Sequence, residues 1–222
     1  RLVGPKGDVV GIDCCDAFLD YARNDAEEKS IANISFQRGD AEIALPVNEY
    51  DFVFARFGTM FFTNPVAAMR NMRLALKPGG TMVHIVWRDR VDNPWLSTAK
   101  EVVLKFLPPP GEDAQTCGPG PFSMANEEMV RGMMKAAGYE EIEFRRVDAQ
   151  VLVGNDVQDA VDFQLALGPA GEVFREAGEE GENKRAEIES ALGEAINAQR
   201  KSAEGIVMDS SSWVISAINP VR

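Results

Sequence analysis

The chain has 222 residues, of which 45% are hydrophobic and 26% are charged, enough for one large domain or two small ones. Its formal net charge is −12 and it has no cluster of five or more Lys and Arg residues, so nucleic acid is not an expected partner. No apolar run approaches the roughly 18 residues that span a bilayer, so we expect no membrane span.

The first half of the chain alternates short apolar strands with helices. Asn64 is a typical N-cap and Pro65 suits a first helical turn, while the stretch 77–80, Lys-Pro-Gly-Gly, ends this helix. The strand that follows is apolar enough for a sheet that is covered on both faces. The expected strands are Val9–Asp13, Ile34–Arg38, Tyr50–Arg56 and 80–87, and the expected helices are 16–26 and 65–76.

From Pro94 the pattern changes to helices with two further strands. Loop 112–122 is rich in Gly and Pro and is expected at the surface, and the acidic stretch 176–184 is expected to be a solvated loop. The expected helices are 95–106, 126–137 (capped by Asn126 and ended by Gly138), 156–167 and 183–200, and the strands are 142–148 and 212–218. Strands that alternate with helices predict an α/β fold with a Rossmann-like, doubly wound and mostly parallel sheet.

The carboxyl ends of the expected strands carry the candidate binding residues, because ligands of open α/β sheets bind there. Asp13 ends the first expected strand, and its carboxylate suits the two vicinal hydroxyls of a ribose. Asp40 follows the next strand and suits an exocyclic amine such as that of adenine. Phe18 or Leu19, in the helix after Asp13, is expected to cover the adenine face.

The sequence offers no dedicated catalytic group. It contains no Ser-His-Asp set, no paired catalytic carboxylates and no metal-ligand cluster, so we expect no catalytic residue and no metal. The single histidine, His84, lies within an apolar strand and is expected to be packed and hydrogen-bonded. Cys14, Cys15 and Cys117 form neither a disulfide framework nor a metal site, which favours a cytoplasmic protein.

Four stretches in order carry a family resemblance: "VVGIDCCDAFLDYAR", "FQRGDAEIALP", "YDFVFARFGTMFF" and "ALKPGGTMVHIVW". They resemble successive motifs of class I S-adenosylmethionine-dependent methyltransferases, in the small-molecule branch similar to the ubiquinone/menaquinone C-methyltransferases. The resemblance covers about 2–95 well and continues more loosely to the end, where 212–220 resembles an antiparallel last strand. It implies one domain, with 1–95 for the cofactor and 96–222 on the substrate side.

The resemblance implies a role for each strand end. Asp13 binds the ribose hydroxyls, and Cys14 offers a backbone contact beside it. Asp40 meets the adenine amine, and the backbone N–H of Ala41 meets a ring nitrogen. Arg56 lies where the strand meets the methionine end of the cofactor, S-adenosyl-L-methionine. Turn 77–80 is architectural.

The family's signature loop, an acidic residue followed by Gly-x-Gly-x-Gly, is absent from the sequence. We expect an N-terminally truncated sequence that lacks the first strand, this loop and the first helix. A diverged relative that binds no cofactor is the alternative. Since that strand lies in the middle of the family's sheet, we expect a gap there and weak cofactor binding by the chain alone.

Aromatic and apolar residues follow two of the strands and are candidates for the acceptor pocket, although their pattern favours the core between helices and sheet. A helical insert, about 154–204, is expected to be either a lid or the contact of a homo-oligomer. The candidate substrate residues are Phe57, Met60, Phe61, Trp87 and Trp95.

Three functions remain open. The first is methyl transfer to a small-molecule acceptor, by direct in-line displacement to O, N or C. The second is an NAD-dependent oxidoreductase, since an acidic residue after a strand also suits the ribose of NAD. The third is a truncated or degenerate domain without catalysis. The motifs "GDAE…LP" and "LKPGG" favour the first.

Overall fold

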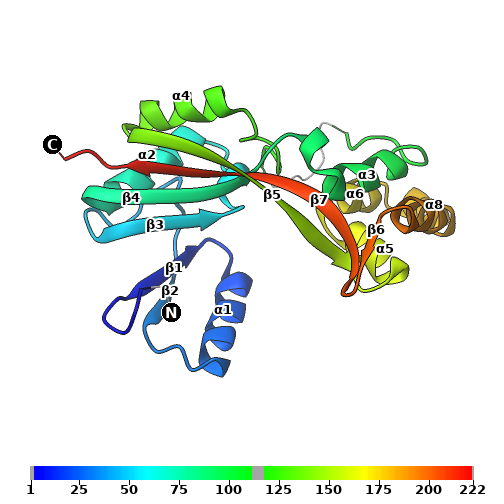
Figure 1. Ribbon diagram of the computed structural model, residues 1–222, viewed down its shortest axis with the longest axis horizontal. Helices are drawn as coiled ribbons and strands as arrows, with labels where there is room; N and C mark the ends of the chain where they lie inside the picture. The colour runs from blue at the N-terminus through cyan, green and yellow to red at the C-terminus, as the bar shows by residue number, and fades with distance from the viewer. Residues whose placement is uncertain (1–2, 112–117, 222) are drawn as a thin grey trace.

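The computed structural model describes residues 3–111 and 118–221 (Figure 1). Within these ranges the chain has an α/β fold, and none of its helices is long and apolar enough to cross a membrane. Part of the expected surface loop 112–122 and all of Cys117 lie outside the described residues.

The described strands form two sheets. In the smaller sheet β1 and β2 are parallel, and the larger has the order β3-β4-β7-β5, with β6 paired to β7. β3 and β4 are parallel, whereas β7 runs antiparallel to β4, so the predicted α/β class and antiparallel last strand are confirmed. The strands are β1 (Val9–Asp13), β2 (Ile34–Arg38), β3 (Tyr50–Arg56), β4 (Leu76–Trp87), β5 (Glu140–Gly154), β6 (Arg200–Ser202) and β7 (Gly205–Ile218).

The division into two sheets leaves β1 and β3 among the edge strands of the described chain. Among the described strands, β1 pairs with β2 alone and β3 pairs with β4 alone. Figure 1 shows β1, β2 and α1 (Asp16–Glu28) as a separate unit below the larger sheet. On the open edge, the β3 side chains of Phe52 and Phe54 are 54% and 56% exposed. That a further strand pairs with these edges stays a prediction.

Helices α2 (Pro65–Ala75) and α4 (Glu127–Ala137) cover one face of the larger sheet (Figure 1). As predicted, the Asn64 and Asn126 side chains cap them, by accepting from the N–H groups of Ala67 and Met129, and Gly138 ends α4 at φ +94°. The prediction that both faces of β4 are covered is correct for one face only. On the α2–α4 face, the side chains of Met82, His84 and Val86 are buried. The alternate residues Val83 and Ile85 are half-buried.

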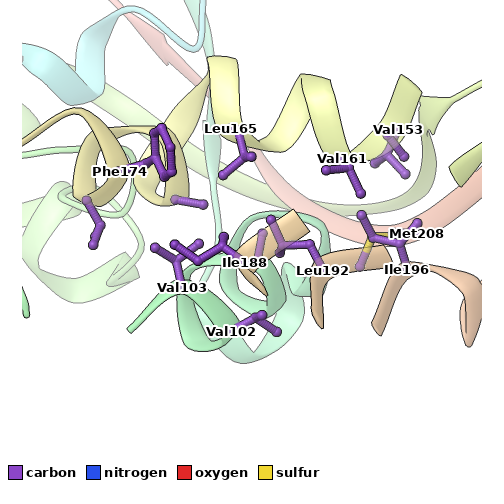
Figure 2. Close-up of a cluster of buried hydrophobic side chains, with 14 of the residues drawn as sticks. Val102, Val103, Val153, Val161, Leu165, Phe174, Ile188, Leu192, Ile196 and Met208 are labelled. Atoms are coloured by element: carbon purple, nitrogen blue, oxygen red, sulfur yellow. The ribbon is translucent and has the colours of Figure 1, made fainter. Parts of the chain in front are cut away.

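A second hydrophobic core lies in a helical lobe around the far ends of β5 and β7. Figure 2 shows Val103, Leu165, Phe174 and Leu192, from four helices, pointing into this core. The helical insert is thus present, but α6, α7 and β6 were missed and the acidic stretch is in part α7 rather than a loop. The helices are α3 (Pro94–Val103), α5 (Val157–Ala166), α6 (Gly168–Glu176), α7 (Glu179–Asn183) and α8 (Arg185–Asn197).

Asn93 joins the end of β4 to the long strand β7. The residue is fully buried, its Nδ2 donates to the carbonyl oxygens of Arg88, Asp89 and Ser211, and its Oδ1 accepts from the N–H of Ser211 at 3.0 Å. Ser211 Oγ in turn donates to Asp148 on β5. Because α3 starts at the next residue, this network fixes the start of the helical lobe against the sheet.

Candidate active site

Two carboxylates lie at the carboxyl ends of the paired strands β1 and β2. The register pairs Asp13 with Arg38 in parallel, so Asp40 follows at the same end of the small sheet. Asp13 Oδ1 accepts from the N–H of Cys15 at 2.8 Å, and Asp40 Oδ1 accepts from the N–H of Glu42 at 2.8 Å. Within the described residues neither carboxylate accepts a further hydrogen bond, so both Oδ2 atoms remain available as acceptors.

The surroundings of these carboxylates are fixed in part by α2. The carbonyl oxygen of Ala41 accepts from the side chain of Asn71 in α2 at 2.8 Å, which holds the loop after β2 in place. Cys14 is exposed beside Asp13. Of the two candidates for covering an adenine ring, Leu19 is buried in the core, whereas Phe18 is 68% exposed and is the one that remains available.

Phe57, directly after β3, has a backbone conformation that is unusual for an aromatic residue. Its φ is +57°, although its N–H still donates to the carbonyl of Ile85 on β4 at 2.9 Å. The ring stacks on Trp87 with centroids 3.8 Å apart, and the guanidinium of Arg56 lies 5.9 Å from the Phe57 ring centroid. A side chain held at positive φ costs about 1–2 kcal/mol, which the stacking and the strand pairing offset.

The aromatic residues form a row from the sheet into the helical lobe. Trp87 meets Trp95 of α3 edge-to-face at 5.1 Å, and Trp95 lies 6.4 Å from Phe163 of α5. Two of the predicted substrate residues differ in exposure: Met60 is 1% exposed and packs in the core, whereas Phe61 is 39% exposed. The structure therefore brings Phe57, Trp87 and Trp95 together and places Met60 beneath the surface.

Replacing Phe57 separates the backbone strain from the stacking. Both Phe57→Ala and Phe57→Gly lose the contact with Trp87, but glycine alone adopts positive φ without steric cost. We expect Phe57→Gly to be more stable than Phe57→Ala by about 1 kcal/mol in urea unfolding. An alanine variant as stable as the glycine variant would show that this backbone is unstrained.

His84 links β4 to the short 3₁₀ helix η1 (Thr59–Phe61) that follows β3. It is fully buried, and its Nδ1 lies 3.1 Å from Thr59 Oγ1, which confirms the prediction of a packed and hydrogen-bonded histidine. Nε2 has no partner among the described residues. Burial lowers the pKa of His84 from 6.5 to about 4, so the imidazole is neutral at pH 7.

The lowered pKa of His84 makes stability depend on pH. The unfolded chain takes up a proton near pH 6.5, whereas the folded chain resists it down to about pH 4, so stability falls as the pH drops through this window. We expect the free energy of unfolding to fall by about 2 kcal/mol between about pH 7.5 and 5.0. Since the sequence has one histidine, His84→Gln removes most of this slope in urea unfolding. The same slope in that variant would contradict the assignment.

A cavity of about 500 Å³ lies between α3, α6 and loop 118–123, and we call it the α3–α6 cavity. Ser123 in its wall donates from Oγ to the carbonyl oxygen of Met60, which sets the cavity beside η1. None of the predicted substrate residues lines it. Its lining gives no signal in the sequence because the residues come from separate segments of the chain: Arg90, Leu96, Lys100, Phe122 and Glu172 among others.

Comparison with known proteins gives consistent matches. A family model described as a methyltransferase domain matches residues 1–105. The ubiquinone/menaquinone biosynthesis C-methyltransferase UbiE of Pseudomonas putida is 31% identical over 162 residues, which cover 68% of this chain and 63% of that protein. The chain thus spans less than two thirds of the length of this relative.

Solved structures match over nearly the whole chain. The YcgJ protein from Bacillus subtilis has a TM-score of 0.57 at 14% identity, covering 96% of this chain and 82% of that chain. Phosphoethanolamine N-methyltransferase 2 of Haemonchus contortus, solved in complex with S-adenosyl-L-methionine, has a TM-score of 0.51 at 16% identity, covering 96% of this chain and 43% of that chain. At these identities the likeness bears on the fold alone.

Proposed function

Because this chain belongs to the S-adenosylmethionine-dependent methyltransferases, we propose that it transfers a methyl group to a small-molecule acceptor by direct in-line displacement. The observation that carries the proposal is the pair of carboxylates at the ends of β1 and β2, each with one oxygen available. Ribose hydroxyls and the adenine amine are hydrogen-bond donors, so two free acceptors at one end of a sheet fit the adenosyl part of the cofactor.

The proposed cofactor residues follow from this fit. Asp13 accepts from the ribose hydroxyls and Asp40 from the adenine amine, while the exposed ring of Phe18 covers the adenine face. Backbone groups of Cys14 and Ala41 complete this half of the site. Arg56 is assigned to the methionine end of the cofactor, and the contribution of a Gly-x-Gly-x-Gly loop to the complete site stays a prediction.

S-adenosyl-L-methionine supplies a methyl group that is already activated on a sulfonium, so no dedicated base is required of the protein. The protein contributes proximity, orientation and exclusion of water. We assign the reacting end of the acceptor to Phe57, Trp87 and Trp95 of the aromatic row and to the exposed Phe61, beside the carboxyl ends of β3 and β4. Such side chains offer flat apolar surfaces beside the ends of the strands.

The test is a titration of the purified protein, with any segments that flank these residues in the gene product, against S-adenosylhomocysteine and NADH. S-adenosylhomocysteine is expected to bind, with no measurable affinity for NADH, by isothermal titration calorimetry. Selective binding of NADH would contradict methyl transfer and favour an NAD-dependent oxidoreductase. Binding of neither ligand would leave a domain without catalysis.

A further inference from the structure

The α3–α6 cavity lies near the carboxyl ends of β3 and β4, beside the residues to which the reacting end of the acceptor is assigned. Arg90 and Val91 in its wall follow the end of β4 by only a few residues, and Ser123 contacts η1, which follows β3. A ligand in the cavity therefore lies beside the strand ends to which the proposed function assigns methyl transfer.

Two basic side chains line the cavity without an acidic partner in the part of the chain that the structure describes. Among the described residues neither Arg90 nor Lys100 forms an ion pair, although the chain has 35 acidic and only 23 basic residues. Nearby Arg88 is the opposite case, since it pairs with Asp92 at 3.0 Å. The guanidinium of Arg90 lies 5.6 Å from the ring centroid of Phe122, which gives it a support within the cavity wall.

The rest of the lining limits what the basic groups can hold. Glu101 and Glu172 line the same cavity, so its net charge is close to zero and a polyanion is disfavoured. Leu96 and Phe122 supply apolar surface to the lining, from α3 and from loop 118–123. This combination fits a small molecule with an apolar body and one anionic group.

We propose that the α3–α6 cavity binds the methyl acceptor through a carboxylate or phosphate group held by Arg90 and Lys100, with the apolar body against Leu96 and Phe122. That the bound molecule is the methyl acceptor rests on the proposed function, whereas anion binding is argued from the cavity alone. Arg90 offers a planar fork of donors and Lys100 an ammonium, so both oxygens of a carboxylate, or two of a phosphate, find donors.

The experiment measures binding of three probes by ligand-observed NMR: benzoate, phenyl phosphate and the neutral benzamide. The two anions distinguish a carboxylate site from a phosphate site, and benzamide reports the apolar contribution alone. The variants are Arg90→Gln, Lys100→Gln and the double variant. Lys105→Gln is the matched control, because Lys105 is exposed just beyond α3, is not among the cavity's lining residues and loses the same charge.

At least one anion is expected to bind about 10-fold more tightly than benzamide, and each cavity variant is expected to lose most of this preference. Lys105→Gln is expected to bind like the wild type, with unchanged thermal unfolding in all variants. Equal binding of benzamide and both anions, or an equal loss in Lys105→Gln, would overturn the anion site. A parallel titration with S-adenosylhomocysteine separates the two proposals. If the protein binds the anion but does not bind S-adenosylhomocysteine, the anion site stands and the acceptor role is overturned.

Discussion

Asp13→Ala is expected to weaken S-adenosylhomocysteine binding by about 10- to 100-fold, the loss that follows from removing hydrogen bonds to a charged acceptor. The physical reason is the free Oδ2 at the end of β1, which the proposal assigns to the ribose hydroxyls. Calorimetric titration of wild type and variant measures the change. The variant also loses the turn made by Oδ1 and the N–H of Cys15, so a second substitution is needed.

Asp13→Asn keeps an oxygen for the N–H of Cys15 but replaces the second acceptor with a donor. It is expected to bind S-adenosylhomocysteine as poorly as Asp13→Ala while unfolding like the wild type. Asp8→Ala, at the exposed residue just before the same strand, changes the charge equally and is expected to leave binding intact. Wild-type affinity in both Asp13 variants would remove the ribose role.

Asn93→Ala is expected to lower the free energy of unfolding by about 3 kcal/mol, measured by urea denaturation. The side chain is fully buried, and its loss leaves both the N–H and the carbonyl oxygen of Ser211 without this partner. The junction between β4, β7 and α3 therefore loses its central hydrogen bonds.

The control for this prediction is Asn197→Ala at the end of α8. Asn197 is exposed and accepts from Lys201, so its loss is expected to cost less than about 0.5 kcal/mol. A cost for Asn93→Ala as small as that for Asn197→Ala would show that backbone pairing alone holds the junction.

The sequence predicted the N-terminal elements well because their signals are local. Val9–Asp13, Ile34–Arg38 and Tyr50–Arg56 are strands with the predicted bounds, since each is a short apolar run between turn residues. Helix α6 was missed because Gly168 and Pro169 are typical of a loop, whereas the structure has them in its first turn and buries Val173 and Phe174 in the core of the helical lobe. Tertiary packing overrides local preference there.

The residues of the candidate site also differ in whether local sequence signals or tertiary packing place them. Asp13 and Asp40 could be predicted because the ends of parallel strands follow directly from the strand pattern. Arg90 and Lys100 could not, because the cavity exists only where α3, α6 and loop 118–123 meet. Met60 was a candidate for the acceptor pocket from its place after β3, yet η1 turns its side chain into the core.

The open edges of β1 and β3 have a consequence for the behaviour of the chain in solution. An unpaired edge presents backbone N–H and carbonyl groups that can template pairing with another polypeptide, and natural proteins protect such edges with charges, prolines or covering elements. Within the described residues, β3 presents the exposed rings of Phe52 and Phe54 beside the exposed charges of Asp51 and Arg56. Where no further strand covers it, such an edge favours self-association and aggregation as concentration rises, through contacts unrelated to the candidate site.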